Sequence, residues 1–265
     1  MTGYIIDCGR FKRVKDKSIG LMELHAFHGF LGLSSDFAVL DTELSIALKT
    51  HDLIGHGSHL SEDEQDFSTE KQVEHWLEQL PRDSILLGYS MGGRLACQIA
   101  CSAPKWLRGL ILVGASAGLS ASNERDSRQR WDNAMAEKLE QGMDAFLRDW
   151  NQMDIIASQQ NIEEKHLQQM QENRRRQNPE MLAKSMRIFG TGTMPSCWGK
   201  LSDVEIPVLL LTGEHDLKYR QITGEMQEIL PNAETHIIEN AGHCCHLEAP
   251  KQTARIIDAW LQYQF

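Results

Sequence analysis

The sequence has no hydrophobic run that approaches the roughly 20 apolar residues of a membrane-spanning helix. Its N-terminal residues 1–17 also lack the apolar core of a secretory signal peptide. Basic residues are few, with 27 Lys and Arg against 37 Asp and Glu, so the net charge is −10 and a basic face for nucleic acid is not expected. These absences predict a soluble, cytoplasmic protein with no nucleic-acid partner and no stable membrane insertion.

Cysteine is present but shows no metal or disulfide pattern. The six cysteines include no C-x-x-C pair, and Cys97 and Cys101 are spaced one helical turn apart. We expect these two to pack as small apolar side chains and expect no metal site. Glycine and proline are too infrequent to indicate disorder, and 265 residues suit one α/β domain, with or without an insertion.

A nucleophile elbow is the most informative motif. Residues 85–87 (Ile-Leu-Leu) predict a buried strand, and residues 95–100 have apolar side chains at helical spacing. Between them lies Gly88-Tyr89-Ser90-Met91-Gly92, a G-x-S-x-G pattern. A Cβ at either glycine would crowd so tight a turn, and the backbone of Ser90 should be strained. Such a turn would hold the Ser90 hydroxyl above the sheet edge, at the N-terminus of a helix.

Strands and helices alternate over most of the chain, which predicts an α/β protein with a mostly parallel sheet and helices on both faces. An antiparallel opening is expected at 4–6 and 11–14. Further strands are predicted at 19–27, 45–49, 85–87, 107–113, 208–211 and 235–238, and helices at 69–80, after the elbow, at 219–230 and at 250–263.

Residues 119–187 differ in character from the rest. Strand signals vanish there, and the sequence is helical and highly charged, with Trp131, Phe146 and Trp150 spaced through it. We predict a helical cap over the sheet edge, inserted into a core formed by residues 1–118 and 188–265.

A serine nucleophile needs a histidine base and an orienting carboxylate. After a G-x-S-x-G elbow, the carboxylate comes first along the chain and the histidine second. The strand at 208–211 leads to Asp216, and the strand at 235–238 leads to His243. We therefore predict a triad of Ser90, Asp216 and His243. Asp216 could instead be a turn residue with Glu214 as the acid, and His246 is the alternative base.

An oxyanion hole is expected from two backbone N–H groups, those of Phe30 and Met91. Phe30 follows the predicted strand that ends at residue 27, and Gly29 would allow close backbone approach. His28 and His56 are expected to have structural roles, His56 as a turn residue.

Several strings resemble the α/β-hydrolase fold across nearly the whole chain: HGFLG at 28–32, DLIGHG at 52–57, GYSMGGR at 88–94, LTGEHDLKY at 211–219 and AGHCCHLEAP at 241–250. Finer details resemble the 2-succinyl-6-hydroxy-2,4-cyclohexadiene-1-carboxylate synthases of menaquinone biosynthesis. These are Arg94 after the elbow, DW at 149–150 and RRRQNPEMLAKSMRIFGTGTMPSCW at 174–198. Ile54 departs from a usual proline, and Asn151 stands where some members have a second aromatic residue.

Arg94 lies one turn after Ser90, where a cation opposes the helix dipole at a cost of about 0.3–1 kcal/mol. That position indicates a nearby anion, from a protein side chain or from a substrate. The resemblance implies that Arg94, Arg130 and Arg175 bind substrate carboxylates. It also makes Tyr89, Trp150 and Trp198 candidate wall residues of the pocket.

The resemblance implies a cofactor-free lyase that acts on a small-molecule polycarboxylate, and we expect a monomer. Such an enzyme eliminates pyruvate from 2-succinyl-5-enolpyruvyl-6-hydroxy-3-cyclohexene-1-carboxylate, with Ser90 as the base. The same triad would also serve a serine hydrolase of esters or C–C bonds. A ligand receptor or scaffold is a third possibility, but it would not need a complete triad. Serine rather than aspartate at position 90 disfavours a haloalkane dehalogenase.

Overall fold

A computed structural model describes residues 23–102 and 104–265 of the chain, and in them six strands form one parallel sheet in the order β2-β1-β3-β4-β5-β6. Every neighbouring pair is parallel. The predicted parallel sheet is therefore confirmed, while the expected strands at 4–6 and 11–14 lie outside the described residues. The strands are β1 (Leu24–Phe27), β2 (Leu48–His51), β3 (Ile85–Tyr89), β4 (Gly109–Val113), β5 (Val208–Gly213) and β6 (Ala233–Ile238).

The second strand starts three residues later than predicted. Ser45 is held away from the sheet, because its amide and hydroxyl both donate to the Asp258 carboxylate. Leu48 is the first residue of β2, and its amide donates to Asp41 Oδ1. Residues 45–47 thus connect to the strand rather than belong to it.

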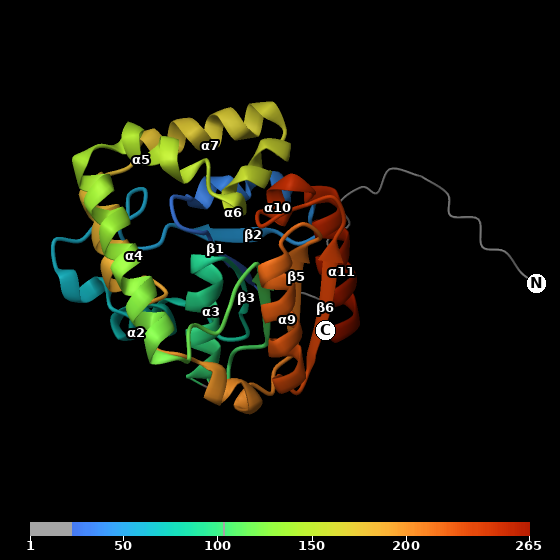
Figure 1. Cartoon of the computed structure of the whole chain (residues 1–265). Helices are drawn as coiled ribbons and strands as arrows, with labels where there is room; N and C mark the ends of the chain where they lie inside the picture. Colours follow the sequence, from blue (N-terminus) through green and yellow to red (C-terminus); the bar gives the residue numbers. More distant parts are fainter. Residues whose placement is uncertain (1–22, 103) are drawn as a thin grey trace, which may run out of the picture.

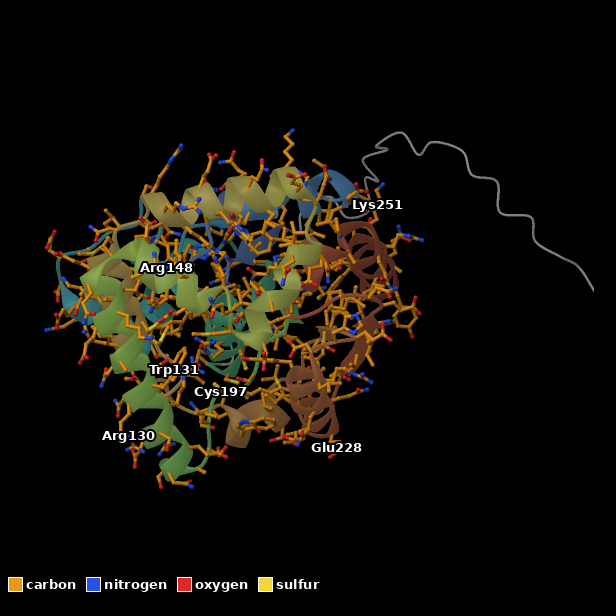
Figure 2. All side chains as sticks on the ribbon, turned by 45° about the horizontal axis from the view of Figure 1, so that its top comes forward. Arg130, Trp131, Arg148, Cys197, Glu228 and Lys251 are labelled. Atoms are coloured by element: carbon orange, nitrogen blue, oxygen red, sulfur yellow. The ribbon has the colours of Figure 1, made fainter. Side chains whose placement is uncertain are left out.

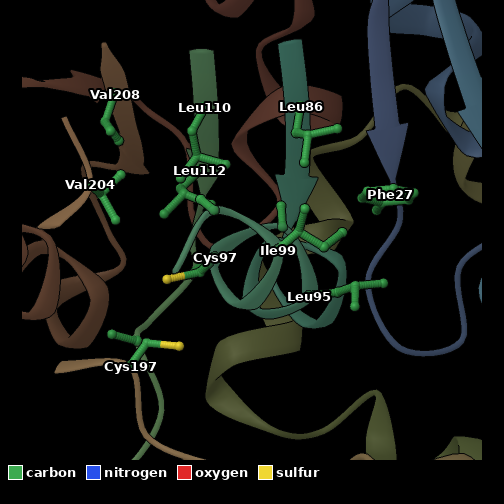
Figure 3. Close-up of a cluster of buried hydrophobic side chains, with 14 of the residues drawn as sticks. Phe27, Leu86, Leu95, Cys97, Ile99, Leu110, Leu112, Cys197, Val204 and Val208 are labelled. Carbon is green, nitrogen blue, oxygen red and sulfur yellow. The ribbon is translucent and has the colours of Figure 1, made fainter. Parts of the chain in front are cut away.

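Helices cover both faces of the sheet (Figure 1). One face carries α1 (Ala38–Glu43) and α11 (Pro250–Gln264), and the other carries α2 (Thr69–Gln79), α3 (Met91–Cys101) and α9 (Leu217–Ile229). Side chains alternate between these faces along each strand, as the two-residue period of a strand requires. Leu110 and Leu112 pack towards α3 (Figure 3), whereas Ile111 joins the cluster on the opposite face.

The strand order places a crevice between β1 and β3. The chain leaves β1 for β2 on one side of it and returns to β3 on the other side. The loops that follow β1 and β3 therefore diverge at this point, and ligands of open α/β sheets bind at such a switch point. Ser90 directly follows β3.

The segment predicted as a cap is helical and has an apolar cluster of its own. Phe146 and Trp150 pack there with Met135, Leu139 and Leu182. Its helices are α4 (Ser122–Gln141), α5 (Met143–Trp150), α6 (Asp154–Ala157), α7 (Glu164–Arg176) and α8 (Pro179–Ile188). Short elements elsewhere are η2 (Ser34–Phe37), η3 (Glu64–Phe67), η4 (Ser158–Asn161), η5 (Trp198–Asp203) and α10 (Cys245–Glu248). Among the described residues, none of the helices combines the length and apolar character needed to span a membrane.

Candidate active site

The turn between β3 and α3 has the strained geometry that the sequence predicts. Ser90 has φ 49° and ψ −106°, a conformation that side chains disfavour. A Cβ at Gly88 would lie 2.4 Å from the Cα of Gly93, and one at Gly92 would lie 2.2 Å from the Phe27 carbonyl oxygen. Both positions therefore require glycine, and the turn presents the Ser90 hydroxyl at the N-terminus of α3.

Ser90, His243 and Asp216 form one chain of hydrogen bonds. His243 Nε2 lies 3.1 Å from Ser90 Oγ, and His243 Nδ1 lies 2.6 Å from Asp216 Oδ2. Asp216 also caps α9, because its Oδ1 accepts from the Tyr219 amide at 3.3 Å. An imidazole oriented in this way can accept a proton from the serine hydroxyl.

Neither Glu214 nor His246, the alternative acid and base, joins these hydrogen bonds. The exposed Glu214 carboxylate accepts from the Asn240 amide at 2.9 Å. His246 is buried, with its ring centroid 5.3 Å from that of Phe37 and 4.5 Å from that of Tyr89. Burial lowers the pKa of His246 to about 3, so this ring is neutral. The geometry therefore favours Asp216 over Glu214 and His243 over His246.

The loop after β1 approaches the serine closely. A Cβ on Gly29 would lie 2.6 Å from the Tyr89 ring, so only glycine fits here. His28 holds the loop: its Nδ1–H donates to the Gly29 carbonyl at 2.8 Å, and its Nε2 accepts from the Leu53 amide at 3.0 Å. Burial lowers the pKa of His28 to about 4, which agrees with a neutral, structural histidine.

His56 has a comparable structural role on the neighbouring turn. Its Nε2 accepts from the Leu31 amide at 3.3 Å, and its Nδ1–H donates to the Ile54 carbonyl at 3.2 Å. Burial lowers its pKa to about 3. Gly55 and Gly57 on either side have φ of +81° and +55°, as a tight turn of this kind requires.

A cavity of about 370 Å³ opens above Ser90, between the sheet edge and the cap helices. Ser90 and His243 of the predicted triad line this cavity, whereas Asp216 lies behind His243. The two predicted oxyanion-hole residues and two predicted wall residues line it as well: Phe30, Met91, Tyr89 and Trp150. The Trp150 ring packs against Phe30 at 5.4 Å, and its buried Nε1 has no partner among the described residues.

Arg94 brings a positive charge into this cavity. Its side chain is buried, and its Nε has no hydrogen-bond partner in residues 23–102 and 104–265. No carboxylate of the same residues lies within salt-bridge distance of it. Burial lowers the pKa of the guanidinium to about 10, so it remains a cation at neutral pH. The predicted anion is therefore not supplied by a described side chain.

Two further arginines line the cavity, and neither was singled out from the sequence. Arg174 is buried and donates from Nη2 to Gln159 Oε1 at 3.0 Å, while its Nε has no partner in the described part of the chain. Arg128 donates from Nε to Asp132 at 2.8 Å, and its guanidinium lies 4.7 Å from the centre of the Trp131 ring. Both can present N–H groups to an anion.

Arg130 and Arg175 are not placed in the cavity, which corrects the expectation for both. Each is exposed, and Arg130 donates to Ser127 Oγ at 3.0 Å on the outside of α4 (Figure 2). Helical phase explains the difference, because one residue turns a side chain by about 100°. The buried face of α7 carries Met170, so Arg174 four residues later shares that face. The same count back from buried Asp132 would have selected Arg128.

Trp198 also lies away from the cavity, so its expected role as a wall residue is wrong. Its Nε1–H donates to the Gly118 carbonyl at 2.9 Å and so joins the segment entering the cap to the segment leaving it. The glycines of the GTG string act nearby. A Cβ at Gly190 would lie 2.5 Å from Asp132 Oδ2, and one at Gly192 would lie 2.5 Å from the Gln129 amide nitrogen. The string thus lets the chain pack tightly on α4, beside the Arg128–Asp132 pair.

Comparison with known proteins agrees with this architecture. Residues 25–256 match the alpha/beta hydrolase family. A Bacillus subtilis (strain 168) protein, whose name marks it as a candidate 2-succinyl-6-hydroxy-2,4-cyclohexadiene-1-carboxylate synthase, is 34% identical over 88% of each chain. The synthase of that name from Shigella flexneri serotype 5b (strain 8401) is 29% identical over 90% of this chain and 93% of its own.

Solved structures show the same relationship. The structure of MenH from S. aureus superposes with a TM-score of 0.85 at 30% identity, covering 92% of this chain and 94% of that one. A thermophilic esterase from Thermogutta terrifontis has a TM-score of 0.76 at 22% identity, covering 92% and 90%, a likeness that extends to the fold alone.

Proposed function

Since the chain belongs to the alpha/beta hydrolase family and, within it, to the group of 2-succinyl-6-hydroxy-2,4-cyclohexadiene-1-carboxylate synthases, we propose that it is a carbon–oxygen lyase of menaquinone biosynthesis. Its reaction would eliminate pyruvate from 2-succinyl-5-enolpyruvyl-6-hydroxy-3-cyclohexene-1-carboxylate. The observation that carries this proposal is the buried cation of Arg94 beside Ser90, which has no carboxylate partner among the described residues, because a tricarboxylate would supply that anion.

In this mechanism Ser90 removes a ring proton. His243 accepts the serine proton through the 3.1 Å contact, and Asp216 stabilises the imidazolium that forms. The electron pair released from the C–H bond moves through the ring and expels the enolpyruvyl oxygen. The C–O bond breaks, and the leaving enolate takes up a proton to become pyruvate. No water is consumed and no covalent bond to Ser90 forms.

The rest of the cavity supports the charge distribution of this reaction. The backbone N–H groups of Phe30 and Met91 would donate to the oxygen where negative charge develops. Arg94, Arg128 and Arg174 would hold the substrate carboxylates, since planar guanidinium groups bind carboxylates through two parallel hydrogen bonds. These contacts strengthen when the cap excludes water and the local dielectric falls.

A serine hydrolase would use the same triad, so the experiment must separate the two chemistries. A hydrolase acylates Ser90 and then admits a water that His243 activates. During turnover of the tricarboxylate, rapid-quench mass spectrometry should therefore find Ser90 unmodified, and pyruvate should appear without a burst. In ¹⁸O-water the cyclohexadiene product should contain no solvent oxygen. A substrate fragment on Ser90, or one solvent oxygen per turnover, would refute the lyase and identify a hydrolase.

A further inference from the structure

Three cysteines from distant parts of the sequence meet at the elbow helix α3. None of them has a role in the proposed reaction. They are Cys97 and Cys101 on α3 and Cys197 just before η5, and their Sγ atoms all lie within 4.8 Å of one another. Cys97 and Cys197 are buried, whereas Cys101 is partly exposed. None of the three lines the cavity above Ser90.

The cluster is built by two independent constraints. Cys97 and Cys101 are four residues apart, so they occupy the same face of α3. Cys197 is fixed against that face, because its amide donates to the Ala117 carbonyl at 2.7 Å and Gln98 of α3 donates to the Pro195 carbonyl at 2.5 Å. Figure 3 shows Cys97 on α3 with Cys197 on the neighbouring segment. The three sulfurs thus converge from a rigid helix and an anchored loop.

The spacing of the three sulfurs is compatible with the binding of one metal ion by all three thiolates. Sulfurs around a tetrahedral ion with metal–sulfur bonds of about 2.3 Å lie about 3.8 Å apart. The described residues of this cluster offer thiols alone, with no carboxylate or imidazole among the donors. All-sulfur donor sets select soft ions such as Cu(I) and Zn(II) over Mg²⁺ and Ca²⁺. Cys101, the partly exposed member, provides an entry path for the ion.

We propose that Cys97, Cys101 and Cys197 form a binding site for one soft, thiophilic d¹⁰ metal ion, distinct from the active site. The three thiols release their protons to solvent as they coordinate, so the affinity rises with pH. The bound ion would link α3, which begins beside Ser90, to the segment through which the chain leaves the cap. An ion that binds only this folded arrangement raises the melting temperature of the protein.

The test uses the full chain carrying Cys8→Ala, so that a cysteine outside the described residues adds no ligand. The protein is reduced, freed of metal and titrated anaerobically with Cu(I), and separately with Zn(II), against a chromophoric chelator. One equivalent of at least one of these ions should bind. Cys101→Ser, at the partly exposed position, should weaken binding by more than about a hundredfold. Cys101→Ala provides a second variant in case the serine disturbs folding.

The matched control is Cys245→Ser, which removes a buried thiol in the cluster on the other face of the sheet. It should retain the full affinity and stoichiometry. The same ion should raise the melting temperature of the parent and of the control, and leave that of Cys101→Ser and Cys101→Ala unchanged. Equal affinity in parent and Cys101 variants, or no binding of either ion to the parent, would overturn the proposal.

Discussion

Replacing Arg94 with methionine should make the protein more stable and less active. Burial lowers the pKa of this guanidinium from its ordinary value to about 10. Each pKa unit corresponds to about 1.36 kcal/mol, so holding the cation in this place costs about 3 kcal/mol. Below pH 10 the folded protein keeps the charge, so the cost is fully present at neutral pH. The cost disappears only as the pH rises above about 10 towards the ordinary pKa of the guanidinium.

Methionine has a similar length, no charge and a flexible stem that fills irregular space. We therefore expect Arg94→Met to raise the free energy of unfolding by about 1–3 kcal/mol. The activity should move the other way. In the proposed complex Arg94 pairs with a substrate carboxylate, and removing one partner of such a buried charge pair costs about 2–5 kcal/mol. The kcat/KM for the tricarboxylate should therefore fall by about a hundredfold or more.

Urea unfolding followed by tryptophan fluorescence measures the stability, and the midpoint should rise without a change in the m-value. The matched control is Arg130→Met, an exposed arginine on α4 that hydrogen-bonds to Ser127 Oγ. This variant should stay within about 0.5 kcal/mol of wild type and keep its activity. An Arg94→Met protein that is less stable than wild type, or one that retains wild-type kcat/KM, would refute the reasoning.

Three further predictions follow from the same structure. Each single variant of the triad, Ser90→Ala, Asp216→Asn or His243→Ala, should lower kcat by orders of magnitude. Double variants should lose little more activity, because the three residues act as one unit. Losses that multiply in steady-state assays would contradict this. Gly92→Ala should fail to accumulate as folded protein, because its Cβ would lie 2.2 Å from a backbone oxygen; a wild-type melting temperature would argue otherwise. Between pH 6.5 and pH 4 the wild type should lose about 3 kcal/mol more stability than His56→Gln, because His56 gains a proton below pH 6.5 in the unfolded protein and only near pH 3 in the folded one. Urea midpoints that fall equally with pH in both proteins would exclude this.

The helices and strands of the core were predictable because their signals are local. A nearly continuous apolar run such as 107–113 indicates a buried strand whatever surrounds it, although pairing begins only at Gly109. The elbow was predictable for a related reason. Its two glycines and serine satisfy a steric requirement that operates within five residues. Chain order then narrowed the acid and the base to two candidates each.

The choice between those candidates depended on tertiary structure. Glu214 and Asp216 are two residues apart, and only the path of the loop after β5 decides which carboxylate faces His243. The cap arginines show the same limit. Arg174 and Arg175 are chemically identical neighbours, and packing of α7 against the body of the protein determines which one is buried.

Local sequence thus determined the fold, the elbow and the residue types of the site, since backbone sterics and hydrophobic patterning act over a few residues. The tertiary structure decided which side chains share the cavity and which thiols meet at Cys197. Such encounters join residues far apart in the sequence, such as Ser90 and His243 or Cys97 and Cys197, and no short-range pattern encodes them. They follow from the packing of whole helices and strands, whose phase and register place each side chain.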